Sequence, residues 1–165
     1  MSATISECGR FRYTLSRSLG ILTAHTPKVV AFIGVNPSTA DADTDDATVR
    51  KWRGFATRWG CDSFVVGNLF AYRATDVREL AKAGDPVGHE NNEHLRAVLD
   101  GVDFVVPCWG SRNKLPPSLR ERIDDVRRML RACASPVRVF GLTASGDPKH
   151  PLMLGYSTEL QDWTP

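Results

Sequence analysis

The sequence predicts an α/β domain in which helices cover both faces of a mostly parallel central sheet of about four strands. Apolar runs of strand length alternate along the chain with segments of helical periodicity, and the runs lack the polar alternation of strands that face water. A length of 165 residues suits one domain with a substantial core. We expect an N-terminal lead-in at 1–27, the core at 28–154 and a C-terminal tail at 155–165.

Four apolar runs supply the expected strands. The first, KVVAFIGV, is continuous enough to be buried on both faces, and the second, SFVVGNLF, has the same character. The runs lie at residues 28–35, 63–70, 103–108 and 137–142. Strands that alternate with helices in this way are typical of layered α/β domains.

Apolar residues at three- and four-residue steps predict the helices between these strands. Val49, Trp52, Phe55 and Trp59 share one face of the first helix, which starts near residue 45 and ends at Gly60, a residue type common just past helix ends. The Trp52 and Trp59 side chains are expected in the core first and at an interface second. Further helices are expected at residues 77–84 after an Asp76 cap, at 89–99, and at 116–131.

Charge and hydropathy exclude some classes of protein. The formal net charge is only +2, so any contact with nucleic acid must come from local clusters. No apolar run approaches the roughly 20 residues that span a bilayer, and the first residues lack the apolar stretch of a signal peptide. We therefore expect a cytoplasmic protein without a membrane partner.

The cysteines do not suggest a metal centre. Cys8, Cys61, Cys108 and Cys133 are far apart and never form C-x-x-C, whereas zinc and iron–sulfur sites usually use close pairs. Reduced thiols packed at the ends of elements are the better interpretation in a cytoplasmic protein. We predict no metal and no cofactor.

Chemically useful side chains follow the expected strands. In open α/β sheets, ligands bind beyond the carboxyl ends of the strands, so these side chains should gather at one edge. An Asn amide offers a donor and an acceptor together, which matches the amide-like edge of a base, and aromatic rings can stack on its face. The candidates are Asn36, Ser38, Thr39, Asn68, Phe70, Trp109, Ser111, Arg112 and His150.

Each candidate also has a structural interpretation. Asn36 before Pro37 could simply start a turn, Asn68 could hold a neighbouring loop, and His150 could anchor the loop before Pro151. Arginines such as Arg73 and Arg112 could meet phosphates or form a solvated face. The run Asp41, Asp43, Asp45 and Asp46 could bind a metal or form the acidic start of a helix, where the helix dipole favours carboxylates.

Familiar catalytic motifs are missing: the sequence has no phosphate loop, nucleophile elbow, zinc helix or Rossmann glycine fingerprint. A different ordered set is present: FIGVNPSTADADTDDATVRKWRGFATRWG, VVGNLFAYRATDVREL, DPVGHEN, WG and GDPKHPLML, with a closing Leu-Gln-x-Trp. This set resembles the domain-of-unknown-function family 1643 over nearly the whole chain. The name of that family carries no activity.

Four shorter segments are similar to motifs of the uracil-DNA glycosylase superfamily. GVNPS resembles the G-[IV]-N-P-G segment of its mismatch-specific branch, VVGNLF the strand with a base-recognising Asn, VVPCWGSR a strand ending in a W-G turn, and KHPLML the H-P-S-P-L loop. The order of the four and their places after strands agree. This resemblance implies a three-layer α/β/α fold of the uracil-DNA-glycosylase type.

The same resemblance implies roles for individual residues. Asn36 would position the water that attacks the sugar carbon, Asn68 would read the amide edge of the base, and His150 would donate a hydrogen bond to the leaving base. Leu152 or Met153 would fill the gap left by an extruded nucleotide. Ser38 and Thr39, near a helix N-terminus, would contact a phosphate or sugar. Apart from the resemblance, Arg73, Ser111 and Arg112 are expected to contact phosphate or nucleic acid.

Three functions stay open. The first is an N-glycosidase that acts on a base, modified or not, in DNA or RNA, including a single-stranded one. The second is a hydrolase or transferase for a free nucleoside or nucleotide, which the low net charge and the acidic run favour. The third is a reader of a modified base that performs no chemistry. The loop reads H-P-L-M-L without the second Ser-Pro pair, which leaves open whether Leu152 or Met153 is the wedge.

Overall fold

We describe the protein from a computed structural model covering residues 2–20, 26–38 and 45–165. The predictions made for Thr39, Asp41 and Asp43 lie outside the described residues. Within them, no helix combines the length and the apolar character needed to cross a membrane.

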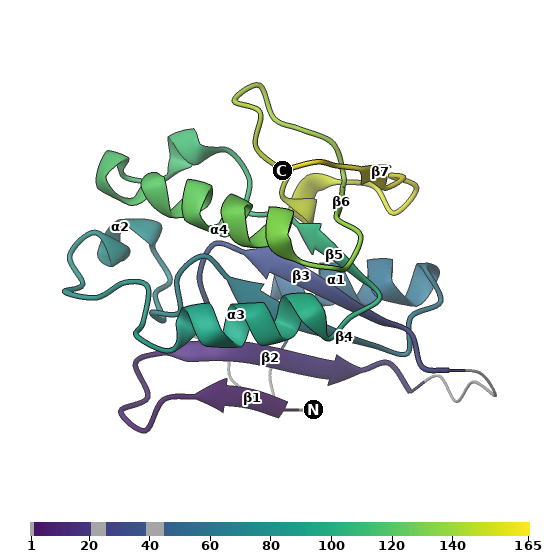
Figure 1. Cartoon of the computed structure of the whole chain (residues 1–165), viewed down its shortest axis with the longest axis horizontal. Coiled ribbons are helices and arrows are strands. Elements are labelled where there is room, and N and C mark those ends of the chain that lie inside the picture. The colour runs from purple at the N-terminus through teal and green to yellow at the C-terminus, as the bar shows by residue number, and fades with distance from the viewer. Residues whose placement is uncertain (1, 21–25, 39–44) are drawn as a thin grey trace.

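The central sheet has five strands in the order β1-β2-β4-β3-β5 (Figure 1). Strand β3 pairs in parallel with β4 and with β5, whereas β2 pairs antiparallel with β1 and with β4. The bounds are β1 Ser2–Ile5, β2 Arg12–Ser18, β3 Val29–Gly34, β4 Ser63–Asn68 and β5 Phe104–Pro107. The chain is thus of the expected α/β class, and its three parallel strands come from three of the four apolar runs.

The expectation of a mostly parallel sheet of about four strands is wrong in two respects. The lead-in at 1–27 supplies β1 and β2, which make the sheet mixed. The last apolar run forms only β6 (Arg138–Val139), which pairs antiparallel with β7 (Gln161–Asp162) and meets β5 through a single bridge from Val137 to Val105.

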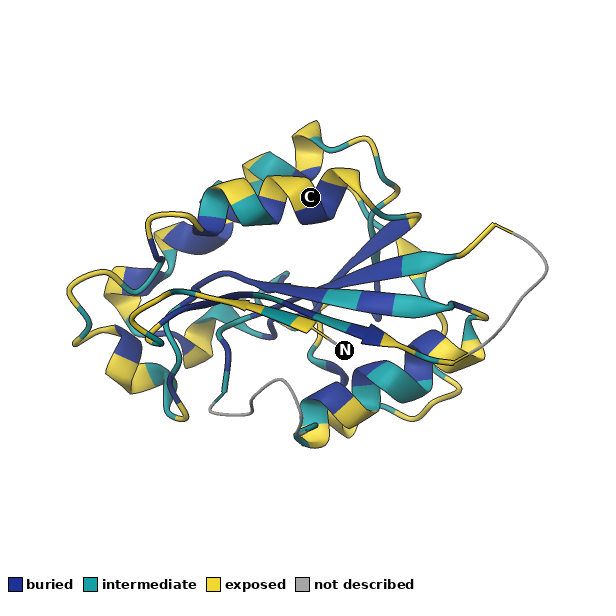
Figure 2. Ribbon diagram, turned by 90° about the horizontal axis from the view of Figure 1, so that it is seen from below, coloured by how far each residue is buried: buried dark blue, intermediate teal, exposed yellow. Residues whose placement is uncertain are grey.

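Helices cover both faces of the sheet, as Figure 2 shows in a view turned by 90° from Figure 1. Helix α1 packs on one face, and α3 and α4 pack on the other. The bounds are α1 Ala47–Arg58, α2 Val77–Leu80, α3 Asn91–Asp100 and α4 Glu121–Ala132. Short 3-10 turns complete the chain: η1 Arg112–Lys114, η2 Pro117–Leu119 and η3 Pro151–Met153.

The two cores explain why the apolar runs are continuous. Successive side chains of a strand point to opposite faces, so Val30 and Phe32 meet α1 whereas Ala31 and Ile33 meet the layer of α3 and α4. The Phe32 ring stacks on Trp52 of α1 with 5.6 Å between centroids. Packing therefore favours an apolar side chain at each of positions 30–33 of β3.

Candidate functional site

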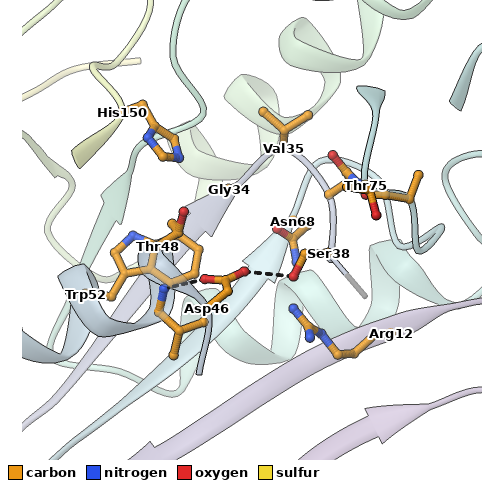
Figure 3. Close-up of a pocket in the computed structure, with 13 residues that line it drawn as sticks. Arg12, Gly34, Val35, Ser38, Asp46, Thr48, Trp52, Asn68, Thr75 and His150 are labelled. Atoms are coloured by element: carbon orange, nitrogen blue, oxygen red, sulfur yellow. Dashed lines mark hydrogen bonds between the residues drawn. The ribbon is translucent and has the colours of Figure 1, made fainter. Parts of the chain in front are cut away.

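A polar cleft of about 270 Å³ lies at the carboxyl end of β3 and β4 (Figure 3). The parallel pairing places Gly34 at the end of β3 beside Asn68 at the end of β4, so the residues that follow both strands share one edge. The start of α1, the segment at 74–75, His150 and the start of β2 complete the wall. Of the predicted residues, the cleft brings together Asn36, Ser38, Asn68 and His150.

Asn68 carries the most informative side chain of the polar cleft. The residue is only 3% exposed, it lines the cleft, and its amide has no hydrogen-bond partner among the described residues. A Cβ on Gly34 would lie 2.8 Å from the Asn68 Oδ1, so the glycine is needed for this amide to fit. The Asn68 Nδ2 and Oδ1 therefore offer a hydrogen-bond donor and an acceptor to the polar cleft.

Asn36 is oriented by the backbone around it. Its Nδ2 donates hydrogen bonds to the carbonyl oxygens of Ala74, at 2.7 Å, and Pro37, at 3.0 Å. Both amide hydrogens are used in this way, which leaves the Oδ1 as the acceptor that Asn36 can offer. The side chain thus fastens a turn, as one interpretation of the sequence had it, and still lines the polar cleft.

His150 presents a hydrogen-bond donor. Its Nδ1 accepts a hydrogen bond from the Leu152 backbone N–H at 3.3 Å, which assigns the proton of the neutral ring to Nε2. Burial lowers the pKa of His150, the charge of Lys114 lowers it further, and Asp46 opposes both. The ring is therefore neutral at pH 7. It is held by the Trp109-Gly110 turn, where Gly110 has a φ of +81° and donates its N–H to the Pro148 carbonyl at 2.9 Å.

The acidic run marks the start of a helix, as far as the structure describes it. Asp46 caps α1 by accepting a hydrogen bond from the Val49 N–H at 2.8 Å and also accepts one from the Ser38 Oγ at 2.7 Å (Figure 3). Burial would raise the pKa of Asp45, but hydrogen bonds from Arg17 and Arg53 more than offset it and lower that pKa. Among the described residues, no group of three or more His, Cys, Asp or Glu side chains could hold a metal ion.

The polar cleft also contains a buried cation, Arg12, which the sequence did not lead us to expect there. Arg12, at the start of β2, is 3% exposed. Burial lowers its pKa to about 10, with further lowering by the charges of Arg73 and Arg17 and an opposing effect of Asp46. The group stays charged at neutral pH. No sequence signal identifies it, because Arg12 belongs to a strand that we did not expect.

A second cavity of about 330 Å³ adjoins the polar cleft, and we call it the apolar annex. It shares Val35, Asn36, Thr75 and His150 with the cleft. The rest of its wall is mainly apolar and comes from Val77, Trp109, Gly110, Ser111, Lys114, Leu115 and Leu152. The predicted residues Trp109, Ser111 and Leu152 therefore lie in the annex rather than in the polar cleft.

Four predicted contact residues lie outside both cavities. Phe70 is 1% exposed and belongs to the core under α3 and α4, so in this structure its ring is not placed to stack on a ligand in either cavity. Arg73 donates to the Gly9 carbonyl oxygen. Arg112 bonds the fully buried Asp147 through its Nε at 3.1 Å, which ties two loops together. Met153 is 90% exposed on η3, beyond the annex.

Two buried polar residues hold the end of β4 in place. The Asn91 Nδ2 donates to the carbonyl oxygens of Asn68 and Leu69, both at 3.2 Å, and the Arg122 Nε donates to the Leu69 carbonyl at 2.8 Å. Asn91 is fully buried and Arg122 is 6% exposed. In the sequence, Asn91 ends the DPVGHEN segment, but nothing in that segment predicts its contact with β4. Arg122 belongs to none of the motifs quoted above.

These features define an α/β protein with a partly enclosed polar cleft and an apolar annex beside it. The cleft holds neutral donors and acceptors together with the Arg12 cation and the Asp46 carboxylate. The chain belongs to the family described as "Protein of unknown function (DUF1643)", which matches residues 12–152. Comparison with curated proteins and with solved structures finds no match. The family match covers every segment that lines the two cavities.

Proposed function

We propose that the polar cleft binds a nucleobase and that the protein hydrolyses the bond between that base and its sugar. The observation that carries this proposal is the amide of Asn68, which has no partner within the described part of the chain and lines a cleft that also holds Asn36 and His150. An amide with a free donor and a free acceptor fits the adjacent C=O and N–H groups of a lactam ring. The enclosed setting strengthens such hydrogen bonds.

Asn36 and His150 suit the two sides of a hydrolytic step. The Asn36 Oδ1 would accept a hydrogen bond from water and orient it toward the anomeric carbon of the sugar. The water oxygen bonds to that carbon, the carbon–nitrogen bond breaks with its electron pair going to the base, and a water proton neutralises the departing base. The neutral His150 Nε2–H would donate to the base as negative charge develops on it.

The resemblance to the uracil-DNA glycosylase superfamily supports this assignment. GVNPS follows β3, the Asn of VVGNLF ends β4, the W-G turn follows β5, and KHPLML leads into η3. These four segments contribute to the walls of the polar cleft or the apolar annex. A uracil-DNA-glycosylase-like arrangement of the three layers is part of the same proposal.

A free nucleoside or nucleotide is a second candidate substrate. Arg73 and Arg112, which were expected to contact phosphates, line neither cavity, and Arg112 is ion-paired with Asp147. The cleft wall itself carries the Arg12 cation and the Asp46 carboxylate, so it is not a purely basic surface of the kind that binds a phosphate backbone. These positions favour a small substrate over duplex DNA.

Release of free base, detected by mass spectrometry, tests the proposal. The panel contains single- and double-stranded DNA, RNA and free nucleosides that carry uracil, hypoxanthine or modified pyrimidines. Wild type is compared with Asn36→Ala, Asn68→Ala and, as a matched control, Asn113→Ala, because Asn113 is exposed and lines neither cavity. We expect release by wild type and Asn113→Ala, and at least a hundredfold slower release by the other two.

The same panel separates the alternatives. Cleavage of polymers that falls steeply with added salt indicates phosphate contacts and counterion release, whereas salt-insensitive cleavage of nucleosides indicates a small substrate. Binding of one substrate without release would make the protein a reader of bases. Absence of both binding and release from every member of the panel contradicts the proposal.

A further inference from the structure

The polar cleft alone is small for a complete ligand. Small-molecule sites commonly measure about 300–1,000 Å³. The polar cleft, at about 270 Å³, falls just below this range, whereas the cleft and the apolar annex of about 330 Å³ together fall inside it. A ligand that fills the whole recess is therefore larger than a bare base ring.

The two cavities lie side by side. Val35, Asn36, Thr75 and His150 line both, so a ligand held by Asn68 that reached past Asn36 and His150 would enter the annex. Asn36 and His150, to which we assign the proposed reaction, therefore lie between the polar cleft and the apolar annex.

The chemistry of the apolar annex differs from that of the polar cleft. Trp109 and Leu115 are each 4% exposed and form a fixed apolar floor, while Leu152, 43% exposed, stands at the rim. Val77 at the start of α2 adds a further branched side chain. An apolar group gains from burial against these side chains. Ser111 and Lys114 give the annex a polar side as well, but the larger part of its wall is apolar.

We propose that the apolar annex is a second subsite, which takes an apolar arm attached to the base bound in the polar cleft. The substrate class is then a base with a bulky, largely apolar substituent. This inference rests on the proposed function, because it takes the polar cleft as the place of the ring.

Matched ligands with and without an apolar arm test the subsite. Uracil and hypoxanthine are each compared with derivatives that carry a benzyl group at every substitutable ring position in turn, so that the correct exit direction is included. Binding to wild type is measured by isothermal titration calorimetry at several temperatures. We expect at least one benzyl derivative to bind at least tenfold more tightly than its parent base, with a more negative heat-capacity change from the apolar burial.

Two neighbouring residues of η3 provide a matched pair of variants. Leu152 lines the apolar annex and Met153 does not, and both are exposed enough for substitution by Gln to leave the fold intact. Leu152→Gln should reduce the preference for the benzyl derivative at least threefold, whereas Met153→Gln should leave it unchanged. Val77→Phe, which narrows the annex from α2, should abolish the preference and keep the affinity for the parent base.

The outcomes distinguish the subsite from the proposed function. Equal affinity for the benzyl derivatives and their parents, or equal effects of Leu152→Gln and Met153→Gln, overturns the subsite and leaves base binding in place. Failure of every ligand to bind overturns the subsite and the proposed base site together.

Discussion

Two buried asparagines, Asn68 at the end of β4 and Asn91 at the start of α3, differ in the use of their amide donors. The Asn91 side chain donates to the Asn68 and Leu69 carbonyl oxygens, whereas the Asn68 side chain has no partner among the described residues and lines the polar cleft. Buried polar groups are nearly always hydrogen-bonded in folded proteins. Asn91 therefore serves the fold, whereas the Asn68 amide is available to the ligand that we propose.

The stability of alanine variants tests this distinction. Asn91→Ala removes a donor from two buried carbonyl groups and should lower the free energy of unfolding by about 1–3 kcal/mol. Asn68→Ala removes an amide that bonds none of the described residues and should change that free energy much less than Asn91→Ala does. Urea denaturation followed by tryptophan fluorescence measures both. An equal loss for the two variants would show that the Asn68 amide is bonded within the fold.

The neutral state of His150 predicts a particular dependence of stability on pH. Burial and Lys114 hold the pKa of His150 below its ordinary value of about 6.5, so the unfolded chain binds a proton more readily than the folded one. This contribution to stability is complete above pH about 6.5 and is lost as the pH falls from there toward the folded-state pKa. We expect urea denaturation at pH 7.5, 6.5 and 5.5 to show a loss that is smaller in His150→Asn.

The Asn substitution is the informative one because it keeps a side-chain acceptor at the start of η3. His150 accepts the Leu152 N–H there, and Asn is a favourable residue at such a position. The remaining pH dependence of His150→Asn then reports the other titrating groups. An identical slope in wild type and variant would mean that the His150 pKa is not shifted by folding.

At the scale of the element, apolar strands could be predicted and polar ones could not. The runs that became β3, β4 and β5 are buried on both faces, so packing alone dictates their composition. Strand β2 alternates buried Tyr13 and Leu15 with half-buried Thr14 and Ser16. It also buries Arg12 and Arg17, whose charges hide its character as a strand in the sequence.

The candidate site could be predicted to the extent that it follows predicted strands. Asn36, Asn68 and His150 were expected to lie together because parallel strands present their carboxyl ends at one edge of the sheet, and all three line the polar cleft. Arg12 could not be found, since it enters the polar cleft from β2. Phe70 was misplaced because sequence alone does not tell whether a residue just past a strand turns toward the cleft or into the core.

Helix α1 depends on Asp46 for its start, and this dependence can be measured. Asp46→Ala removes the acceptor for the Val49 N–H and should lower the free energy of unfolding by about 0.5–2 kcal/mol. Asp46→Asn keeps an acceptor at the cap and should change it by no more than a few tenths of a kcal/mol. Thermal and urea denaturation of both variants checks the expectation. Equal losses would mean that the charge of Asp46 matters more than its role as a cap.

For the whole molecule, β2 joins the edge of the sheet to the proposed site. It pairs with both β1 and β4, it brings Arg12 to the polar cleft, and its Arg17 Nε bonds the Asp45 Oδ1 at 2.9 Å just before α1. The Arg17 side chain is fully buried, whereas the Asp45 side chain is 19% exposed, so the ion pair is buried at its Arg17 end. Removing one partner of such a pair is strongly destabilising because it leaves the other charge poorly compensated.

Two shortened proteins separate the contributions of β1 and β2. Deletion of residues 1–6 removes β1, whose residues are mostly exposed, and should leave a folded protein. Deletion of residues 1–18 removes the 1% exposed Tyr13 and Leu15 and leaves the hydrogen-bonding edge of β4 open. Each such side chain contributes about 1.5–3 kcal/mol, against a total stability of about 5–15 kcal/mol for a domain of this kind.

We therefore expect the shorter deletion to retain a cooperative thermal transition and resistance to proteolysis, and the longer one to lose both. Far-ultraviolet circular dichroism and limited trypsin digestion measure these properties side by side. A folded protein after the longer deletion would show that the parallel strands and their helices are sufficient for the fold. Such a protein would still lack Arg12, so its affinity for the uracil and hypoxanthine ligands would then measure the contribution of β2 to the polar cleft.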